Sequence, residues 1–111
     1  MEARAHLSHA RITPRKVKIV CDLIRDKDTK TAVAILMNTP NAAAVLLLKL
    51  VNSAVANAEN NHSMDPDNLY ISETFANPGP TLKRGMARAR GGYARILKRT
   101  SHITVVVKEK E

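Results

Sequence analysis

Aromatic residues are scarce in this sequence. Its 111 residues include one Phe, two Tyr and no Trp, which together make up 3% of the chain. Proteins that hold nucleic acid by stacking bases rely on aromatic side chains at several positions. The composition therefore argues against a binding platform built from aromatic rings.

Cysteine is nearly absent, and the common catalytic and metal-binding motifs are missing. Cys21 is the only cysteine, which excludes an internal disulfide and a cysteine-based zinc cluster. His6 and His9 lie three positions apart in a predicted strand, so we expect them to face opposite sides. The sequence contains no phosphate-binding loop, zinc-protease motif or serine-hydrolase motif. It therefore predicts no catalytic residue, no metal site, no cofactor and no enzymatic activity.

Long apolar segments are lacking too. The longest apolar run covers residues 42–48, which is short of the roughly 18 residues that cross a membrane. The first ten residues lack the apolar segment of a signal peptide, which predicts a protein of the cytosol. A chain of this length usually folds around one core, so we expect a single domain over residues 1–111.

What the sequence has in excess is positive charge. It contains 18 Lys and Arg against 10 Asp and Glu, which gives a net charge of +8 and a pI of about 10.1. Seven of the basic residues lie in residues 83–99, where no acidic residue occurs, whereas residues 21–82 carry four bases and seven acids. This excess indicates a polyanionic partner, either nucleic acid or an anionic membrane.

Three helices are predicted in the first half of the chain. Thr13-Pro14 is typical of a helix start, and this helix should end at residues 26–28. Thr29 is the expected cap of a second helix that runs to about residue 37. The residues of this helix that are predicted to face inward are Val33, Leu36 and Met37. A third helix, about 41–61, has one narrow polar stripe, so we expect its other faces to be buried at the centre of the domain.

Strands are predicted on both sides of these helices. Residues 2–10 alternate as a short strand, and Leu69, Ile71 and Phe75 alternate as a second one. Residues 102–107 are rich in β-branched side chains, which favours a third strand. The order predicts an α+β fold, with a small three-stranded antiparallel sheet packed with three helices.

The basic stretch between the last two strands predicts a long, protruding β-hairpin over about residues 81–99. Gly91-Gly92 is a favoured turn pair and places the tip near residues 89–93. Neither face of the hairpin is apolar, and an isolated two-stranded ribbon is marginal in water, so we expect it to be ordered only on a partner. Arg outnumbers Lys here, and guanidinium groups match phosphate geometry. The alternative is a solvated, flexible basic loop.

A second basic cluster surrounds the start of the first predicted helix. Its members are Arg11, Arg15, Lys16 and Lys18. Cations at a helix N-terminus oppose the helix dipole, but a phosphate bound between them and the free amides would reverse the sign of that interaction. This favours a second nucleic-acid contact, with side chains that only extend into water as the alternative.

Five motifs resemble the bacterial large-subunit ribosomal protein L-twenty-two family, in the same order and over nearly the whole chain. They are Thr13-Pro14-Arg15-Lys16-Val17, Asp22-Leu23-Ile24-Arg25, Ala56-Asn57-Ala58-Glu59-Asn60, Gly79-Pro80-Thr81-Leu82-Lys83-Arg84 and Lys98-Arg99-Thr100-Ser101-His102-Ile103-Thr104-Val105-Val106. The resemblance implies a cytoplasmic constituent of the large ribosomal subunit that binds large-subunit (23S) ribosomal RNA and supports subunit assembly. It also implies a hairpin that lines the polypeptide exit tunnel beside ribosomal protein L-four, near the macrolide site, where nascent chains pass. Membrane contacts and a homo-oligomer are not expected.

The resemblance also implies site residues. Those carried over as binding ribosomal RNA are Arg11, Arg15, Lys16, Lys18, Lys83, Arg84, Arg88, Arg90, Arg95, Lys98, Arg99, Thr100, Ser101 and His102. Those carried over as the tunnel-lining tip are Arg88, Ala89, Arg90, Gly91 and Gly92. The family often has Gly where Asp26 stands, so we expect the first helix to end without a left-handed residue.

An architectural DNA-binding protein with basic β-arms is the alternative function. Such proteins bend DNA by inserting a proline or a bulky apolar wedge from the arm tip. Residues 88–93 offer no such wedge, which counts against this alternative.

Overall fold

The computed structural model describes residues 2–87 and 93–109. Its elements, in chain order, are β1 (Glu2–Ala10), α1 (Pro14–Ile24), α2 (Thr29–Met37), α3 (Ala42–His62), the 3-10 helix η1 (Pro66–Asn68), β2 (Leu69–Pro78), β3 (Leu82–Ala87), β4 (Tyr93–Lys98) and β5 (Ser101–Glu109). The predicted order of strand, three helices and further strands is therefore confirmed.

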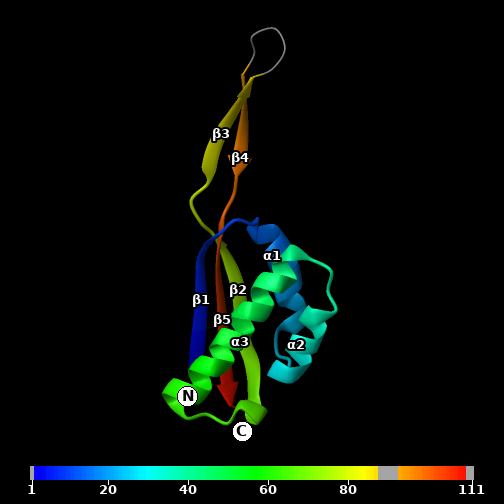
Figure 1. The fold of residues 1–111 in the computed structure, drawn as a ribbon, viewed down its shortest axis with the longest axis vertical. Helices are drawn as coiled ribbons and strands as arrows, with labels where there is room; N and C mark the ends of the chain where they lie inside the picture. The colour runs from blue at the N-terminus through cyan, green and yellow to red at the C-terminus, as the bar shows by residue number, and fades with distance from the viewer. Residues whose placement is uncertain (1, 88–92, 110–111) are drawn as a thin grey trace.

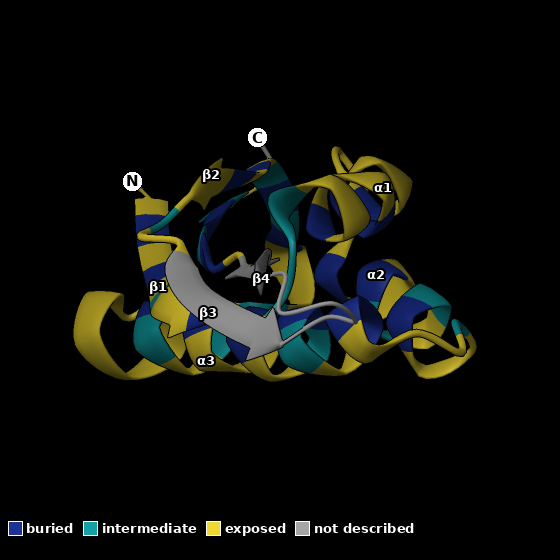
Figure 2. Ribbon diagram, turned by 90° about the horizontal axis from the view of Figure 1, so that it is seen from above, coloured by how far each residue is buried: buried dark blue, intermediate teal, exposed yellow. Residues whose placement is uncertain are grey.

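A three-stranded antiparallel sheet forms one layer of the fold, with the strand order β1-β5-β2. Helices α1, α2 and α3 lie on one side of it (Figure 2). Val105 of the central strand β5 stands opposite Ala5 on β1 and opposite Thr74 on β2, and all three are buried. The core lies between this face of the sheet and the helices, which confirms the predicted α+β fold.

Strand β2 carries a β-bulge that the apolar alternation did not reveal. Ile71 pairs with Val107 and Glu73 with Val106, so Ser72 is one extra residue in the ladder. Because side chains alternate with a period of two, this insertion moves the next residues to the opposite face. Thr74 is buried in place of Phe75, which is 38% exposed. The predicted inward position of Phe75 is therefore wrong.

Helix α2 begins and packs differently from the prediction. Asp28, not Thr29, is its N-cap residue, and Thr29 is buried within the first turn. Leu36 is buried as predicted, and Val33 packs at the edge of the core. Met37 was predicted to face inward, but it is 70% exposed. It lies one residue, or about 100° around the helix, beyond Leu36, and so points away from the core.

Helix α3 contacts both other helices and the strands β1 and β5. The side chain of Asn41 accepts a hydrogen bond from the Ala43 amide at 2.9 Å, so Asn41 is the N-cap residue of the helix. Burial is less complete than expected, since Val45 is 54% exposed. The helix is long and apolar enough to meet the length and composition criterion for a membrane span, yet its buried side chains belong to the core of this fold.

The turn after α1 uses a left-handed residue although it contains no glycine. Asp26 adopts a φ of 64°, so the family-based expectation of no left-handed residue here is wrong. Asp is among the few residues that tolerate this conformation. The turn brings the Asp26 amide to Ile71 O and the Ile71 amide to Lys27 O, both at 2.9 Å.

These hydrogen bonds also cover the outer edge of the sheet at β2. Arg25 adds a third contact there, from its Nη2 to Thr74 O at 2.9 Å. On the opposite edge, Asn57 Nδ2 of α3 donates to Arg4 O of β1 at 3.0 Å. Each edge strand thus has backbone groups bound by a neighbouring segment of the same chain.

Strands β3 and β4 form an antiparallel ribbon of their own, here called the ribbon. Its ladder runs from Leu82 opposite Lys98 to Ala87 opposite Tyr93. The ribbon continues beyond the end of the three-stranded sheet, away from both chain termini (Figure 1). It accounts for much of the long axis of a molecule that measures 64 × 26 × 17 Å. The predicted tip, residues 88–92, lies outside the described residues.

Candidate nucleic-acid interface

Three segments of the chain meet where the ribbon joins the sheet. They are the β1–α1 connection with the start of α1 (residues 11–16), the β2–β3 connection (79–81) and the β4–β5 connection with the first residue of β5 (99–101), and together they are called the junction. The β1–α1 connection passes across the base of the ribbon (Figure 1). Hydrogen bonds fix the two ribbon connections to each other: the Gly79 amide donates to Thr100 O at 2.9 Å, and Thr100 Oγ1 donates to Pro80 O at 2.6 Å.

Thr100 and Ser101 lie inside the junction, although the family resemblance carried them over as RNA-binding residues. Thr100 is 4% exposed, and Ser101 is fully buried with its Oγ donating to Ile12 O at 2.6 Å. Both hydroxyls are therefore used within the chain. These hydrogen bonds tie the junction segments to one another, and RNA contact by the two residues stays a prediction.

Gly79 is a junction residue whose role the sequence analysis missed. A Cβ atom at this position would lie 2.6 Å from Thr100 Oγ1 and 3.1 Å from His102 Nε2. Real Cβ atoms essentially never approach other heavy atoms below 3.0 Å. Glycine thus lets β2 and β5 come together where the ribbon begins. The only sequence signal was the Pro-Gly-Pro run at residues 78–80.

Three histidines gather beside the junction. The ring of His102 lies 4.9 Å from that of His9 and 6.1 Å from that of His6, measured between centroids. The expected placement of His6 and His9 on opposite sides is therefore wrong. Two features change the alternation: His9 has a φ of 58°, and the β1–β5 register shifts between Leu7 and Ala10.

The histidine rings are held by hydrogen bonds within the chain. His102 Nδ1 accepts from the His9 amide at 3.2 Å, which places the proton of a neutral His102 ring on Nε2. His6 Nδ1 lies 2.8 Å from Thr104 Oγ1. Among the described residues, no group of three or more His, Cys, Asp or Glu is arranged to hold a metal ion.

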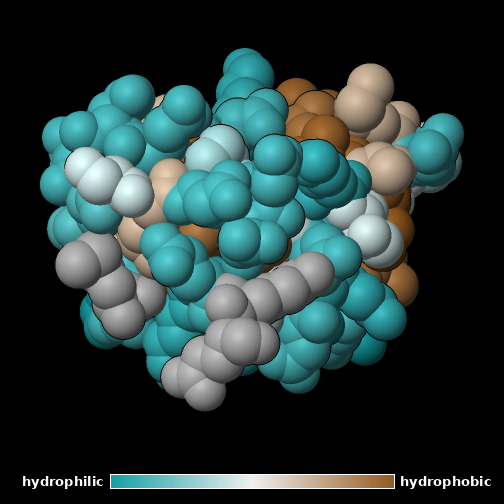
Figure 3. All heavy atoms as spheres, turned by 90° about the horizontal axis from the view of Figure 1, so that it is seen from below, coloured by the Kyte–Doolittle hydropathy of each residue, from teal (hydrophilic) through white to brown (hydrophobic). Residues whose placement is uncertain are grey.

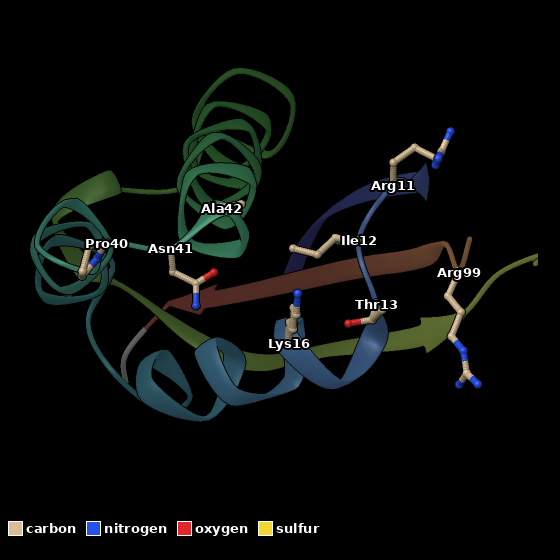
Figure 4. Close-up of a pocket in the computed structure, with 8 residues that line it drawn as sticks. All are labelled: Arg11, Ile12, Thr13, Lys16, Pro40, Asn41, Ala42 and Arg99. Atoms are coloured by element: carbon tan, nitrogen blue, oxygen red, sulfur yellow. The ribbon is translucent and has the colours of Figure 1, made fainter. Parts of the chain in front are cut away.

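A hollow of about 730 Å³ opens on one side of the junction and is called the first hollow (Figure 4). Its lining residues are Arg11, Ile12, Thr13, Lys16, Pro40, Asn41, Ala42 and Arg99. Lys16 extends from α1 into the space between Ile12 and Asn41, and Arg11 and Arg99 direct their guanidinium groups outward on either side (Figure 4). The sequence did not predict that the start of α3 would lie against this basic cluster.

A second hollow, of about 490 Å³, lies on the other side of the same connection. Its lining residues are Thr13, Pro14, Arg15, Pro78, Gly79, Thr81, Arg99 and Thr100. Thr13 and Arg99 line both hollows, so the hollows adjoin along these two residues, and this shared wall is called the ridge. Thr13 caps α1 by backbone position, as predicted, but its side chain makes no capping hydrogen bond. Among the described residues that line the two hollows, none is acidic.

The basic side chains of the junction differ in their partners from those around the sheet. Four cations outside the junction are ion-paired: Arg4 with Glu2 (3.1 Å), Arg25 with Asp22 (2.6 Å), Lys30 with Asp67 (2.8 Å) and Lys108 with Glu2 (3.9 Å). The hydrogen bond and charge of Asp67 raise the pKa of Lys30. Arg11, Arg15, Lys16 and Arg99 form no ion pair with any residue in the part of the chain that the structure describes.

The structure thus brings together four of the predicted RNA-binding cations: Arg11, Arg15, Lys16 and Arg99. Lys18 is exposed on α1 and lines neither hollow. The predicted residues Lys83, Arg84, Arg95 and Lys98 belong to the ribbon strands. Arg88 and Arg90, with the rest of the predicted tip, lie outside the described residues.

Cys21 takes no part in this surface. It is fully buried, and its Sγ accepts a hydrogen bond from Thr74 Oγ1 at 3.4 Å. Burial raises the pKa of the thiol, which keeps it protonated and unreactive at neutral pH. Cys21 is therefore a thiol of the hydrophobic core.

Comparison with known proteins identifies the family. Residues 5–108 match the family model described as ribosomal protein L22p/L17e. Large ribosomal subunit protein uL22 of Acetivibrio thermocellus is 58% identical over 109 residues, which cover 98% of this chain and 87% of that protein. The proteins of the same name from Clostridium novyi and Clostridioides difficile are 56% and 55% identical, and each alignment covers 99% or more of both chains. The chain therefore belongs to the ribosomal protein L22p/L17e family, a family of structural ribosomal proteins, as its five motifs predicted.

Proposed function

We propose that this protein is a structural constituent of the large ribosomal subunit in the bacterial cytoplasm and that it binds 23S ribosomal RNA through the junction and the ribbon. The observation that carries the proposal is a set of four junction cations that form no ion pair with a carboxylate among the described residues, next to a ribbon whose sequence is rich in Arg. Unpaired cations on a rigid surface are available for phosphate groups. The relatives named as large-subunit proteins support the same conclusion.

The RNA contacts that we propose are made by cations among the residues carried over from the family. At the junction these are Arg11, Arg15, Lys16 and Arg99, with Lys18 farther along α1. On the ribbon they are Lys83, Arg84, Arg88, Arg90, Arg95 and Lys98. His102 lies at the edge of this surface. Binding to several separated RNA segments would help to hold them together during subunit assembly, which is the second part of the proposal.

We also propose that the tip, Arg88 to Gly92, lines the polypeptide exit tunnel beside ribosomal protein L-four, where nascent chains pass. The projection of the ribbon from one end of the sheet supports this role, because it carries residues far from the core (Figure 1). The hydrogen-bonded junction gives the ribbon a fixed starting direction.

RNA binding is tested by the salt dependence of affinity for large-subunit ribosomal RNA. Replacing Arg15, Lys16 and Lys18 together by Gln should lower the slope of log affinity against log salt by about 2, since each phosphate contact contributes about 0.7–0.9. Lys49→Gln on α3, an exposed position outside both hollows, is the matched control. An unchanged slope in the triple variant would show that this cluster faces only water.

Assembly and tunnel lining need tests in the ribosome. A tagged copy of the chain should sediment with large subunits, and its absence from them would overturn the proposal. For the tip, an Ala89→Cys variant should crosslink to stalled nascent chains, because the buried Cys21 will not compete for the reagent. Lys27→Cys, in the exposed turn after α1, is the control and should give no crosslink. Equal crosslinking from both positions would contradict tunnel lining.

A further inference from the structure

The two hollows at the junction share a wall, and that wall carries a cation. Arg99 and Thr13 line both hollows, whereas Lys16 lines only the first and Arg15 only the second. A basic surface thus runs from Lys16, over the ridge, to Arg15. A chain of phosphates that follows this surface from one hollow to the other must pass Arg99.

The shape of this surface suits an unpaired RNA segment better than a duplex. The hollows, of about 730 and 490 Å³, fall in the range of about 300–1,000 Å³ that is typical of sites for small organic groups. An A-form duplex keeps its bases stacked inside a regular helix and therefore offers no single nucleotide to a hollow. An unpaired strand can bend over the ridge and extend a nucleotide into a hollow.

The walls of the second hollow fit a ribose or a base. Pro14, Pro78 and Gly79 supply apolar, low-profile surface there, and Arg15 and Arg99 supply charge. In the first hollow, the Lys16 side chain projects into the hollow, and the Thr13 hydroxyl lies on the side of Thr13 that faces Lys16 (Figure 4). The Thr13 hydroxyl makes no capping bond to α1, so it remains able to donate to a phosphate oxygen at the ridge.

We propose that the two hollows form one continuous track for an unpaired segment of ribosomal RNA, with Arg99 on the ridge contacting the phosphates that lead into both. This inference rests on the proposed RNA-binding function and specifies the form of RNA that the junction takes. It predicts that the loss of RNA affinity on replacing Arg99 depends on whether Lys16 or Arg15 is present. The losses on replacing Lys16 and Arg15 should be independent of each other.

Double-mutant cycles test this pattern with the full chain and a transcript of large-subunit ribosomal RNA as the probe. Arg99→Gln, Lys16→Gln and Arg15→Gln are measured singly and in pairs, with Lys49→Gln as the control. Each pair that includes Arg99 should lose at least about threefold less affinity than the product of its single losses, because residues that hold one group are coupled. The Lys16→Gln/Arg15→Gln pair should equal the product of its single losses, and Lys49→Gln should change affinity less than about twofold.

A competition measurement tests the form of the RNA. Oligouridylate of about 12 nucleotides should displace the transcript from the junction more effectively than an RNA duplex of the same length, and Arg99→Gln should abolish that preference. Multiplicative losses in all three pairs, or equal competition by the two RNAs, would overturn the track while leaving RNA binding intact. A wild-type chain without salt-dependent affinity for the transcript would instead overturn the proposed function itself. Far-UV circular dichroism and thermal unfolding of each variant keep a folding defect from being counted as lost binding.

Discussion

The body of the protein, formed by the three-stranded sheet and its helices, differs from the ribbon in what stabilises it. Its central strand β5 is covered by a β-strand on each side and by helices on one face. The ribbon strands β3 and β4 make their main contacts with each other. The body therefore contains the interactions that order it, whereas we expect the ribbon to be ordered only on a partner.

The two regions also differ in how their charges are balanced. The body carries ion pairs such as Arg25–Asp22 and Lys30–Asp67, and residues 21–82 contain more acids than bases. Seen from the end opposite the ribbon, the surface is largely hydrophilic, with a hydrophobic patch on one side (Figure 3). At the junction, Arg11, Arg15, Lys16 and Arg99 form no ion pair with the residues that the structure describes. The body therefore balances part of its charge within the chain, whereas these junction cations are available to the polyanionic partner that we propose.

Amide hydrogen exchange on the free protein should show the largest difference between the two regions. Amides in the middle of α3 should exchange at least about a thousandfold more slowly than those of β3 and β4, because only the former require opening of the core. Mass-spectrometric exchange of the free chain measures both. If the amides of β3 and β4 were as protected as those of α3, the ribbon would be stable without a partner. The two regions would then not differ in stability.

Ile103→Ala tests the body's dependence on its core. Ile103 is fully buried on β5, so the variant should lose about 2–5 kcal/mol of unfolding free energy. Ile96→Ala in β4 is the matched substitution in the ribbon and should cost less than about 1 kcal/mol. Chemical denaturation followed by circular dichroism compares the two. Similar losses would mean that the ribbon belongs to the same cooperative unit as the sheet.

Gly79→Ala tests the junction, where the two regions join. The added Cβ must displace Thr100 or His102, both of which are already hydrogen-bonded, so we expect a loss of about 1–2 kcal/mol. Gly85→Ala within β3 is the control, since that residue belongs to the ribbon. Thermal unfolding reports both variants. An unchanged unfolding free energy in Gly79→Ala would show that the junction accommodates the added Cβ and does not fix the direction of the ribbon.

Met37→Gln should have the smallest effect. The side chain was expected in the core from its helical spacing, but it is 70% exposed, so the substitution should change the unfolding free energy by less than about 0.5 kcal/mol. Leu36→Ala, one residue earlier and buried, should cost several times more. Equal losses from the two variants would place Met37 back in the core.

The sequence predicted the elements well because their signals are local. Asn41 caps α3 through its own side chain, and the β-branched run in β5 is extended wherever it lies. The errors arose where one residue changes the geometry of those that follow. The extra residue Ser72 turned Phe75 outward, and the positive φ of His9 turned its ring toward His102. Neither feature has a period or a motif that marks it.

The candidate site was predicted in composition but not in arrangement. Lys16 and Arg99 were both expected to bind RNA, yet 83 positions separate them in the sequence, and only the fold places them around one hollow. Ser101 carried no local sign that its hydroxyl would bind Ile12 O. Charge can be counted from a sequence. Whether a polar group is hydrogen-bonded within the chain or is available to a partner depends on long-range packing.

The covered edges of the sheet affect how copies of the free chain meet one another. An exposed edge strand is a template on which a second copy can add its own strand, and such pairing leads to aggregation. Here Asp26 and Lys27 occupy backbone groups of Ile71 on one edge, and Asn57 occupies a carbonyl of Arg4 on the other. A copy of the chain therefore offers fewer open backbone groups along the edges of its three-stranded sheet to a second copy, which disfavours edge-to-edge aggregation.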